Sequence, residues 1–82
     1  MNEKYIMNKL QEIFKDIFGD NSILIEKSTN PNDIEGWDSI THISILEAVQ
    51  DEFKFKLSLD EMIELSSVGK IMDIITQKTQ KK

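Results

Sequence analysis

The sequence predicts an all-α fold, a small four-helix bundle with three longer helices and one short one, and three observations support this. Apolar residues recur at intervals of three and four in three separate segments, which is typical of amphipathic helices. Only residues 53–57 alternate between apolar and polar side chains, and a single strand has nothing to pair with. The 82 residues suffice for one domain, residues 1–82, whose core depends on apolar burial because cysteine is absent.

The first helix is expected over residues 3–18, with Gly19 as its stop signal. Its apolar stripe consists of Ile6, Leu10, Ile13, Phe14 and Ile17. A long connection, residues 20–38, then leads to the second helix. The connection contains apolar residues of its own, so we expect it to pack against the helices: Ile23, Leu24, Ile25 and Ile34. Loops of this length are uncommon in small domains and tend to be functional.

The second helix is expected to begin at Asp38-Ser39, because aspartate is a preferred N-cap residue. The apolar spacing predicts a buried face made of Ile43, Leu46, Val49 and Phe53. The polar residues between them are expected to face the solvent: Glu47, Gln50, Asp51 and Lys54.

Serine residues mark the beginnings of the last two predicted helices. Ser58 and Glu61 form a capping box, which predicts a short helix over residues 59–65. Ser66 or Ser67 caps the last helix. The apolar positions of this helix fit the 3.6-residue period: Val68, Ile71, Met72 and Ile75. The polar tail, residues 76–82, is expected to fray.

The charge distribution limits the partners that the protein can have. Fifteen acidic residues, ten lysines and no arginine give a net charge of −5, which argues against nucleic-acid binding because phosphates attract basic clusters. Residues 33–64 carry −7 and the rest of the chain +2, so the middle of the chain would attract basic protein surfaces. The apolar runs are too short to span a membrane, and the N-terminus is too polar for a secretory signal. We therefore expect a cytoplasmic protein.

Catalytic and metal-binding constellations are not expected. One histidine and no cysteine cannot supply a typical transition-metal site. Ser39 and His42 could approach each other on one helix, but Asp38 adjoins Ser39 and cannot orient the imidazole from its far side. We expect His42 to face the solvent or a docking surface, and we expect no catalytic residue.

Residues 36–40, with the sequence Gly-Trp-Asp-Ser-Ile, are the most informative segment. Ser39 is expected in the first turn of a helix, where backbone N–H groups lack partners and the helix dipole favours anions. A phosphodiester on the Ser39 hydroxyl would therefore meet the positive end of the helix. The same residues are also compatible with an ordinary helix start.

Asp38-Ser39-Ile40 resembles the Asp-Ser-Leu phosphopantetheine attachment motif of the acyl carrier proteins and related carrier domains. The resemblance extends without gaps from residue 38 to residue 75, through the acidic second half of the second helix and the beginnings of the third and fourth. Before residue 38 the agreement is one of length and pattern only. Ile40 replaces the usual leucine, which is a conservative change in an apolar contact.

The resemblance implies that a phosphopantetheinyl transferase, with magnesium, attaches a 4'-phosphopantetheine arm from coenzyme A to Ser39. The arm carries acyl or aminoacyl groups as thioesters and presents them to acyl-loading and acyl-processing enzymes, in fatty acid, polyketide or other specialised biosynthesis. The protein would then be a monomeric carrier and not an enzyme. The implied residues for recognition by basic partner patches are Asp38, Ile40, Glu47, Asp51 and Glu52. The candidates for lining the cargo are Leu46, Val49, Met62, Leu65 and Ile71, each of which also fits an ordinary core position.

Two departures from the family pattern favour a dedicated, specialised pathway. The first turns of the second helix carry Thr41, His42 and Ser44, so they are less acidic than in carriers for primary fatty acid synthesis. Trp37 precedes the motif and is expected to be exposed. The alternative function is that of an unmodified acidic helical adaptor that binds a basic protein.

Overall fold

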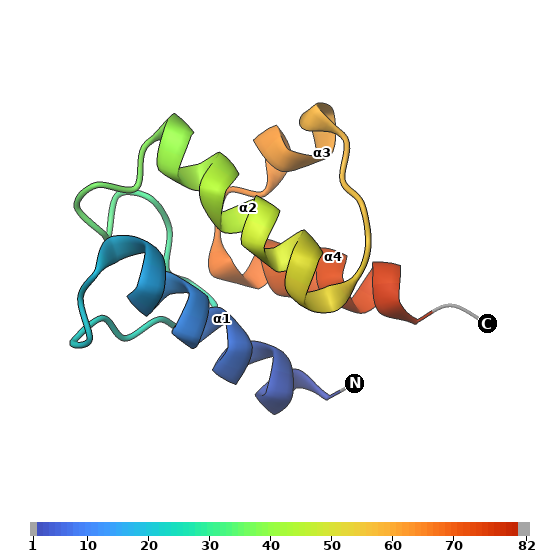
Figure 1. Ribbon diagram of the computed structural model, residues 1–82, viewed down its shortest axis with the longest axis horizontal. Helices are drawn as coiled ribbons and strands as arrows, with labels where there is room; N and C mark the ends of the chain where they lie inside the picture. Colours follow the sequence, from blue (N-terminus) through green and yellow to red (C-terminus); the bar gives the residue numbers. More distant parts are fainter. Residues whose placement is uncertain (1, 81–82) are drawn as a thin grey trace.

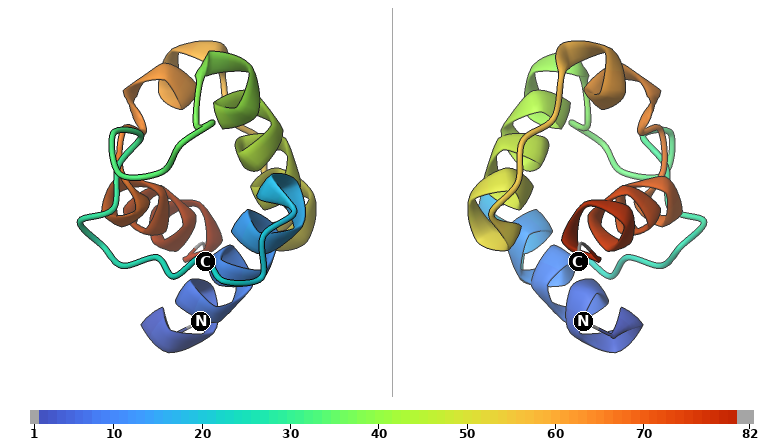
Figure 2. Two further views of the ribbon diagram at one scale, coloured as in Figure 1. Left: turned by 90° about the vertical axis from the view of Figure 1, so that its left-hand side faces the viewer. Right: turned by 90° about the vertical axis from the view of Figure 1, so that its right-hand side faces the viewer.

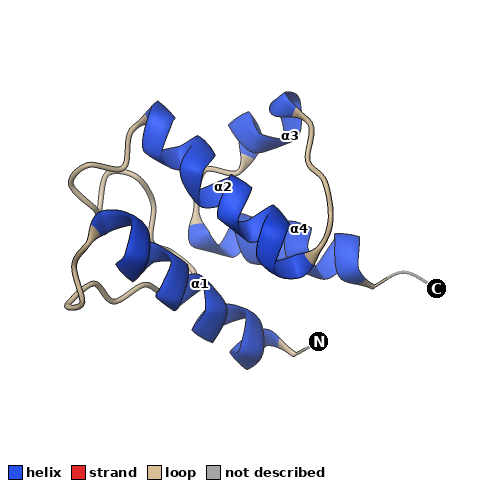
Figure 3. Ribbon diagram, viewed as in Figure 1, coloured by secondary structure: helices blue, strands red, loops and turns tan. Residues whose placement is uncertain are grey.

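The computed structural model describes residues 2–80 of the chain, and this part contains four helices and no strand. The helices are α1 (Glu3–Phe18), α2 (Ser39–Phe53), α3 (Leu59–Glu64) and α4 (Val68–Thr79). α1 runs in roughly the opposite direction to α2 and α4, and the short α3 lies beside the first half of α2 (Figure 1). Figure 3 shows how much of the chain the long loop between α1 and α2 occupies. The predicted all-α bundle is thereby confirmed.

A side-chain cap precedes each helix. The four N-cap residues are Asn2, Asp38, Ser58 and Ser67. The predicted capping box is present, since Glu61 N donates to Ser58 Oγ at 3.1 Å and Ser58 N donates to Glu61 Oε1 at 2.9 Å. α1 ends at the predicted Gly19, whose φ of +62° is accessible to glycine without strain. α3 ends one residue earlier than expected, at Glu64.

The core lies between α1, α2 and α4, which surround it in the end-on views of Figure 2. Its largest fully buried side chains are Ile6, Leu10, Phe14, Ile45, Leu46, Val49, Val68, Ile71 and Ile75. Within residues 2–80, no helix has both the length and the apolar content that crossing a membrane requires.

Two predictions about α2 were wrong: one residue predicted to be buried is exposed, and one predicted to face the solvent is half-buried. Ile43 is 37% exposed, and Ile45 is fully buried in its place. Gln50 is half-buried, because its side-chain oxygen accepts a hydrogen bond from Leu57 N at 2.7 Å. Apolar residues occur on two sides of this helix, so periodicity alone could not select the side that packs against α1.

The end of α4 also differs from the expectation. The helix continues to Thr79, so residues 76–79 of the tail that was expected to fray are helical in the structure. Within this last part of the helix, Lys78 pairs with Glu61 on α3 at 3.2 Å. Residues 81 and 82 of the predicted frayed tail lie outside the described part of the chain.

The loop over residues 20–38 packs down on both sides, as expected. The Gln11 side chain on α1 donates to Ile23 O and accepts from Ile25 N. On the other side, Val68 N donates to Thr29 O and Gly69 N donates to Lys27 O, both at 2.9 Å, so the loop satisfies the first N–H groups of α4.

Leu24 is the exception within this loop. It is 84% exposed, whereas its neighbours Ile23 and Ile25 contact the core. The connection as a whole packs down as expected, but this one apolar side chain faces the solvent.

Candidate functional site

Ser39 is the first residue of α2, and its side chain is exposed. The preceding residue fixes the start of the helix, since Asp38 Oδ1 accepts from Thr41 N at 2.9 Å and Asp38 O accepts from His42 N at 2.8 Å. The Ser39 hydroxyl is thus presented to solvent from the positive end of a 15-residue helix.

A turn at Gly36 delivers the chain to this position. Gly36 has a φ of +93°, a backbone conformation that side chains with a Cβ rarely adopt. Trp37 N donates to Ile34 O at 3.3 Å, and Asp38 N donates to Gly36 O at 3.0 Å. The turn is therefore held by backbone hydrogen bonds immediately before the capping residue.

The electrostatics of the helix start suit an anion. The backbone N–H and the hydroxyl of Thr41 hydrogen-bond to Asp38 and lower the pKa of its carboxyl below the ordinary 3.8. This carboxylate is directed to the cap, and the first turn of α2 contains no other acidic residue. A phosphodiester on Ser39 would meet the N–H groups of the helix start without an opposing acid in that turn.

Trp37 is buried, with 5% of its surface exposed, so the prediction of an exposed aromatic was wrong. Its ring meets that of Phe14 on α1 edge-on, with 5.1 Å between the ring centres. Its indole Nε1 donates to His42 Nδ1 at 3.0 Å. The residues next to Trp37 in the sequence are not apolar, so they give no indication that its side chain is buried. Its burial depends on contact with α1, which is distant in the sequence.

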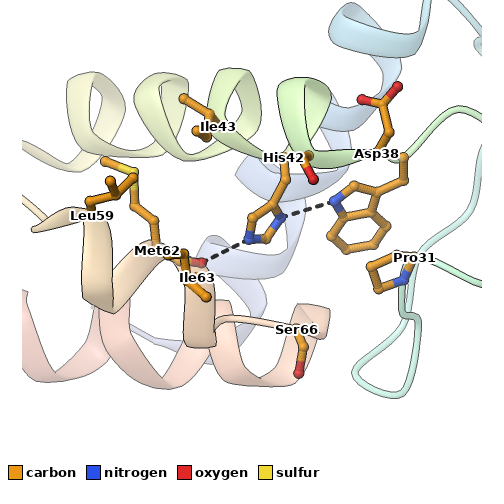
Figure 4. A pocket seen from close by; sticks show the side chains of 10 residues that line it. Pro31, Asp38, His42, Ile43, Leu59, Met62, Ile63 and Ser66 are labelled. Carbon is orange, nitrogen blue, oxygen red and sulfur yellow. Dashed lines mark hydrogen bonds between the residues drawn. The ribbon is translucent and has the colours of Figure 1, made fainter.

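His42 is half-buried and connects two helices, so the expectation that it faces solvent or a docking surface was wrong. Its Nε2 lies 2.9 Å from Met62 O on α3, and its ring stacks near that of Trp37 (Figure 4). Because an indole N–H can only donate and a carbonyl can only accept, Nδ1 accepts and Nε2 carries the proton. Both ring nitrogens are engaged, so His42 is not available as a base for Ser39.

A pocket of about 350 Å³ lies between α2 and α3 and borders Ser39 (Figure 4). Its apolar side is formed by Ile43, Leu59, Met62 and Ile63, and the remaining lining residues are Pro31, Trp37, Asp38, Ser39, His42 and Ser66. Pockets of this size are within the range that binds small ligands.

Of the five cargo-lining candidates, only Met62 lines this pocket. The other four are buried members of the hydrophobic core: Leu46, Val49, Leu65 and Ile71. Leu65 also borders a more open depression between α3 and α4. The bundle therefore uses most of these residues for its own packing.

The recognition candidates lie at different distances from Ser39. Asp38 and Ile40 flank it directly, and Ile40 is exposed. Glu47, Asp51 and Glu52 are exposed about 12 to 20 Å farther along the axis of α2, at 1.5 Å per residue. Glu52 lies 3.6 Å from Lys9 on α1, so part of its charge is balanced within the chain. Among residues 2–80, no group of three or more side chains is arranged to hold a metal ion.

Sequence reasoning missed an apolar patch next to Ser39. It consists of Ile40 and Ile43 from α2 together with Leu59 and Ile63 from α3, all of them exposed. None of the residues of α3 is buried: its apolar side chains line the pocket, and of these Met62 also packs against the core. The signal was present in α2, which has more apolar residues than a single buried stripe requires.

Three comparisons relate this chain to known proteins. The family model described as phosphopantetheine attachment site matches residues 8–75 and so includes most of α1 and the whole long loop. The acyl carrier protein of Guillardia theta is 29% identical over 79 residues, which cover 95% of this chain and 96% of that protein. The solution NMR structure of the holo acyl carrier protein from Geobacter metallireducens superposes with a TM-score of 0.81 at 33% identity, over 89% of this chain and 84% of that one.

Proposed function

The chain belongs to the phosphopantetheine-attachment family and is of the acyl carrier protein type, and from this premise we propose that Ser39 bears its 4'-phosphopantetheine arm. Proteins of this type are carriers and not enzymes. When attached, the arm supplies a terminal thiol that holds an acyl group as a thioester. The observation that carries the assignment is the exposed hydroxyl of Ser39 at the positive end of α2.

The residues around Ser39 fit such an attachment. The Asp38 cap keeps the first turn of α2 in one conformation, so the transferase meets a hydroxyl in a fixed position. In the transfer, the Ser39 oxygen forms a bond to the pantetheine phosphorus, and the pyrophosphate P–O bond of coenzyme A breaks. The nucleotide leaves with the other phosphate, and the hydroxyl proton passes to the transferase or the solvent. The negative charge that remains on Ser39 is stabilised by the helix start.

The family implies interaction with enzymes of acyl metabolism, and the surface suggests how these partners bind. We propose that the apolar patch of Ile40, Ile43, Leu59 and Ile63 forms the centre of the contact around Ser39. The more distant acids, Glu47 and Asp51, then attract basic partner surfaces before contact. The first turn of α2 lacks acids, and this supports dedicated partners in a specialised pathway. We further propose that the carrier acts as a cytoplasmic monomer.

Intact-mass measurement tests the assignment of Ser39. After incubation with coenzyme A, magnesium and a broad-specificity transferase, the native chain is expected to gain one phosphopantetheinyl group. Ser39→Ala is expected to gain none. Ser66→Ala is the matched control, because Ser66 also borders the pocket and is exposed, and it should gain one group.

Two results would contradict the proposal. If Ser39→Ala still gains the group, another hydroxyl is the attachment point. If the native chain gains nothing from a transferase that modifies a reference carrier in parallel, the unmodified adaptor is the better description.

A further inference from the structure

We propose that His42 is a positioning residue that holds α3 beside the pocket and thereby controls how well the acylated arm on Ser39 is sheltered there. The His42 bridge is defined here as the two hydrogen bonds that join Trp37 to His42 and His42 to Met62. This inference rests on the proposed function, because the sheltered group is the cargo attached at Ser39.

α3 has little packing of its own to hold it in place. None of its six residues is buried, and Leu59 and Ile63 are 59% and 68% exposed. Within the helix Met62 packs partly against the core, and the buried residues Leu57 and Leu65 hold the chain on either side of it. The capping box of Ser58 and Glu61 stabilises the helix internally, but it does not attach the helix to the rest of the bundle. Since apolar burial is what fixes most helices in a domain, the position of α3 depends more than usual on its polar links.

Two side-chain links connect α3 to other helices in the described part of the chain. Glu61 pairs with Lys78 on α4 at 3.2 Å, but both side chains are more than a third exposed, and exposed ion pairs contribute little to stability. The other link is the bond from His42 Nε2 to Met62 O, which is partly buried and 2.9 Å long. Met62 O also accepts a hydrogen bond from Leu65 N at 3.2 Å within the last turn of α3, so loss of the His42 bond removes the donor of Met62 O that comes from another helix.

The bridge is anchored at its other end in the core. The Trp37 ring is buried against Phe14, and its indole N–H fixes the tautomer of His42 in which Nε2 can donate to Met62. The connection therefore runs from α1 through Trp37 and His42 to α3. In Figure 4 His42 lies between the apolar residues Ile43 and Met62 on one side and Pro31 on the other, and the three residues of the bridge all line the pocket.

The bridge also lies next to the proposed attachment point. His42 follows Ser39 by three residues on α2, which places the two on neighbouring positions of one helix face. Ser39, His42 and Met62 all line the same pocket. Loss of the bridge allows α3 to move away from α2, and the pocket that adjoins the arm then opens to solvent.

Three variants test the role of His42. His42→Phe keeps an aromatic ring but removes both hydrogen bonds. His42→Gln supplies one amide donor and one carbonyl acceptor, as the neutral imidazole does. Gln11→Met is the matched control, because the Gln11 side chain also hydrogen-bonds to backbone groups, those of Ile23 and Ile25 in the long loop, and not to the segment that leads into α3.

The readouts are amide hydrogen exchange in α3 of the unmodified chain and the rate at which hydroxylamine cleaves a hexanoyl thioester on the loaded chain. His42→Phe is expected to raise both rates by about fivefold or more. This is the effect of losing one partly buried hydrogen bond, here the bond from His42 to Met62 O on α3. His42→Gln should return both rates most of the way to native values. Gln11→Met should leave both unchanged, although it lowers global stability.

The proposal is overturned if His42→Phe is loaded normally and both rates equal those of the native chain. If His42→Phe does not fold, Trp37→Phe takes its place, because it keeps a ring against Phe14 and removes only the indole donor. Failure of the proposed function can be distinguished from failure of the His42 inference, because the native chain would then not be loaded at all. In that case hydrogen exchange in α3 still tests the bridge.

Discussion

The residues next to Ser39 have structural partners within the chain. Asp38 caps α2 through Thr41, and His42 is held between Trp37 and Met62. Ser39 itself is exposed at the start of the helix. An exposed hydroxyl at a capped helix start, near a histidine whose ring nitrogens are both engaged, suits the proposed modification of Ser39 by another enzyme.

The charge of Asp38 leads to a prediction about pH. Because the Thr41 backbone N–H lowers its pKa in the folded chain, Asp38 stabilises the fold above the ordinary value of 3.8 and loses this effect as the pH falls through the lower folded pKa. Asp38→Asn keeps a capping oxygen but lacks the charge. We expect Asp38→Asn to unfold at a lower urea concentration than the native chain at pH 6, and the difference to narrow at pH 3.

Urea titrations monitored by circular dichroism at the two pH values measure this difference. Glu64→Gln is the control, because it removes an exposed carboxylate that caps no helix. A difference for Asp38→Asn that stays constant between pH 6 and pH 3 would show that the charge of the cap does not matter.

At the scale of elements, the long loop forms hydrogen bonds with the helices on both of its sides. Gln11 binds two backbone groups of the loop, while loop carbonyl groups accept the first N–H groups of α4. Gly69 is suited to this contact, since a Cβ at its position would lie 3.0 Å from Lys27 O. The loop therefore joins α1 to α4 and fixes the approach to Ser39.

Replacing Gln11 by methionine tests this role of the loop. The substitution keeps the length of the side chain but leaves Ile23 O and Ile25 N without their partner, and both bonds are partly buried. We expect the free energy of unfolding to fall by about 1–3 kcal/mol in urea titrations. Gln77→Met on the exposed side of α4 should change it by less than about 0.5 kcal/mol. Equal effects of the two variants would contradict the role assigned to Gln11.

At the scale of the whole molecule, charge and apolar surface are separated along α2. Residues 33–64 carry a net charge of −7, but the surface nearest Ser39 is the apolar patch. The exposed acids Glu47 and Asp51 lie farther along the helix. Under the proposed function, long-range attraction of a basic partner and close contact with it therefore involve different parts of α2.

This separation predicts two different responses to salt. The double variant Glu47→Gln/Asp51→Asn should slow modification by a basic transferase, measured as kcat/KM, by on the order of tenfold at low ionic strength. The effect should largely disappear at high salt, where exposed charges are screened. Ile43→Ser should slow modification at both ionic strengths, because it changes the contact itself.

Asp16→Asn on α1 is the control for net charge, since this residue is exposed and distant in sequence from the patch. If it slows modification as much as a substitution in α2 does, the total charge matters and not its position.

The sequence by itself determined the four helices, the N-caps of the last three and the Asp38-Ser39-Ile40 motif. These features depend on interactions between residues within about four positions of one another, which spacing and residue type reveal. The tertiary structure alone decided that Ile45 and not Ile43 faces the core, that Trp37 is buried, and that His42 reaches Met62. Each of these features depends on contact with a helix that is distant in the sequence. For α2 in particular, apolar residues occur on two sides of the helix, so the helical period alone does not show which side is buried.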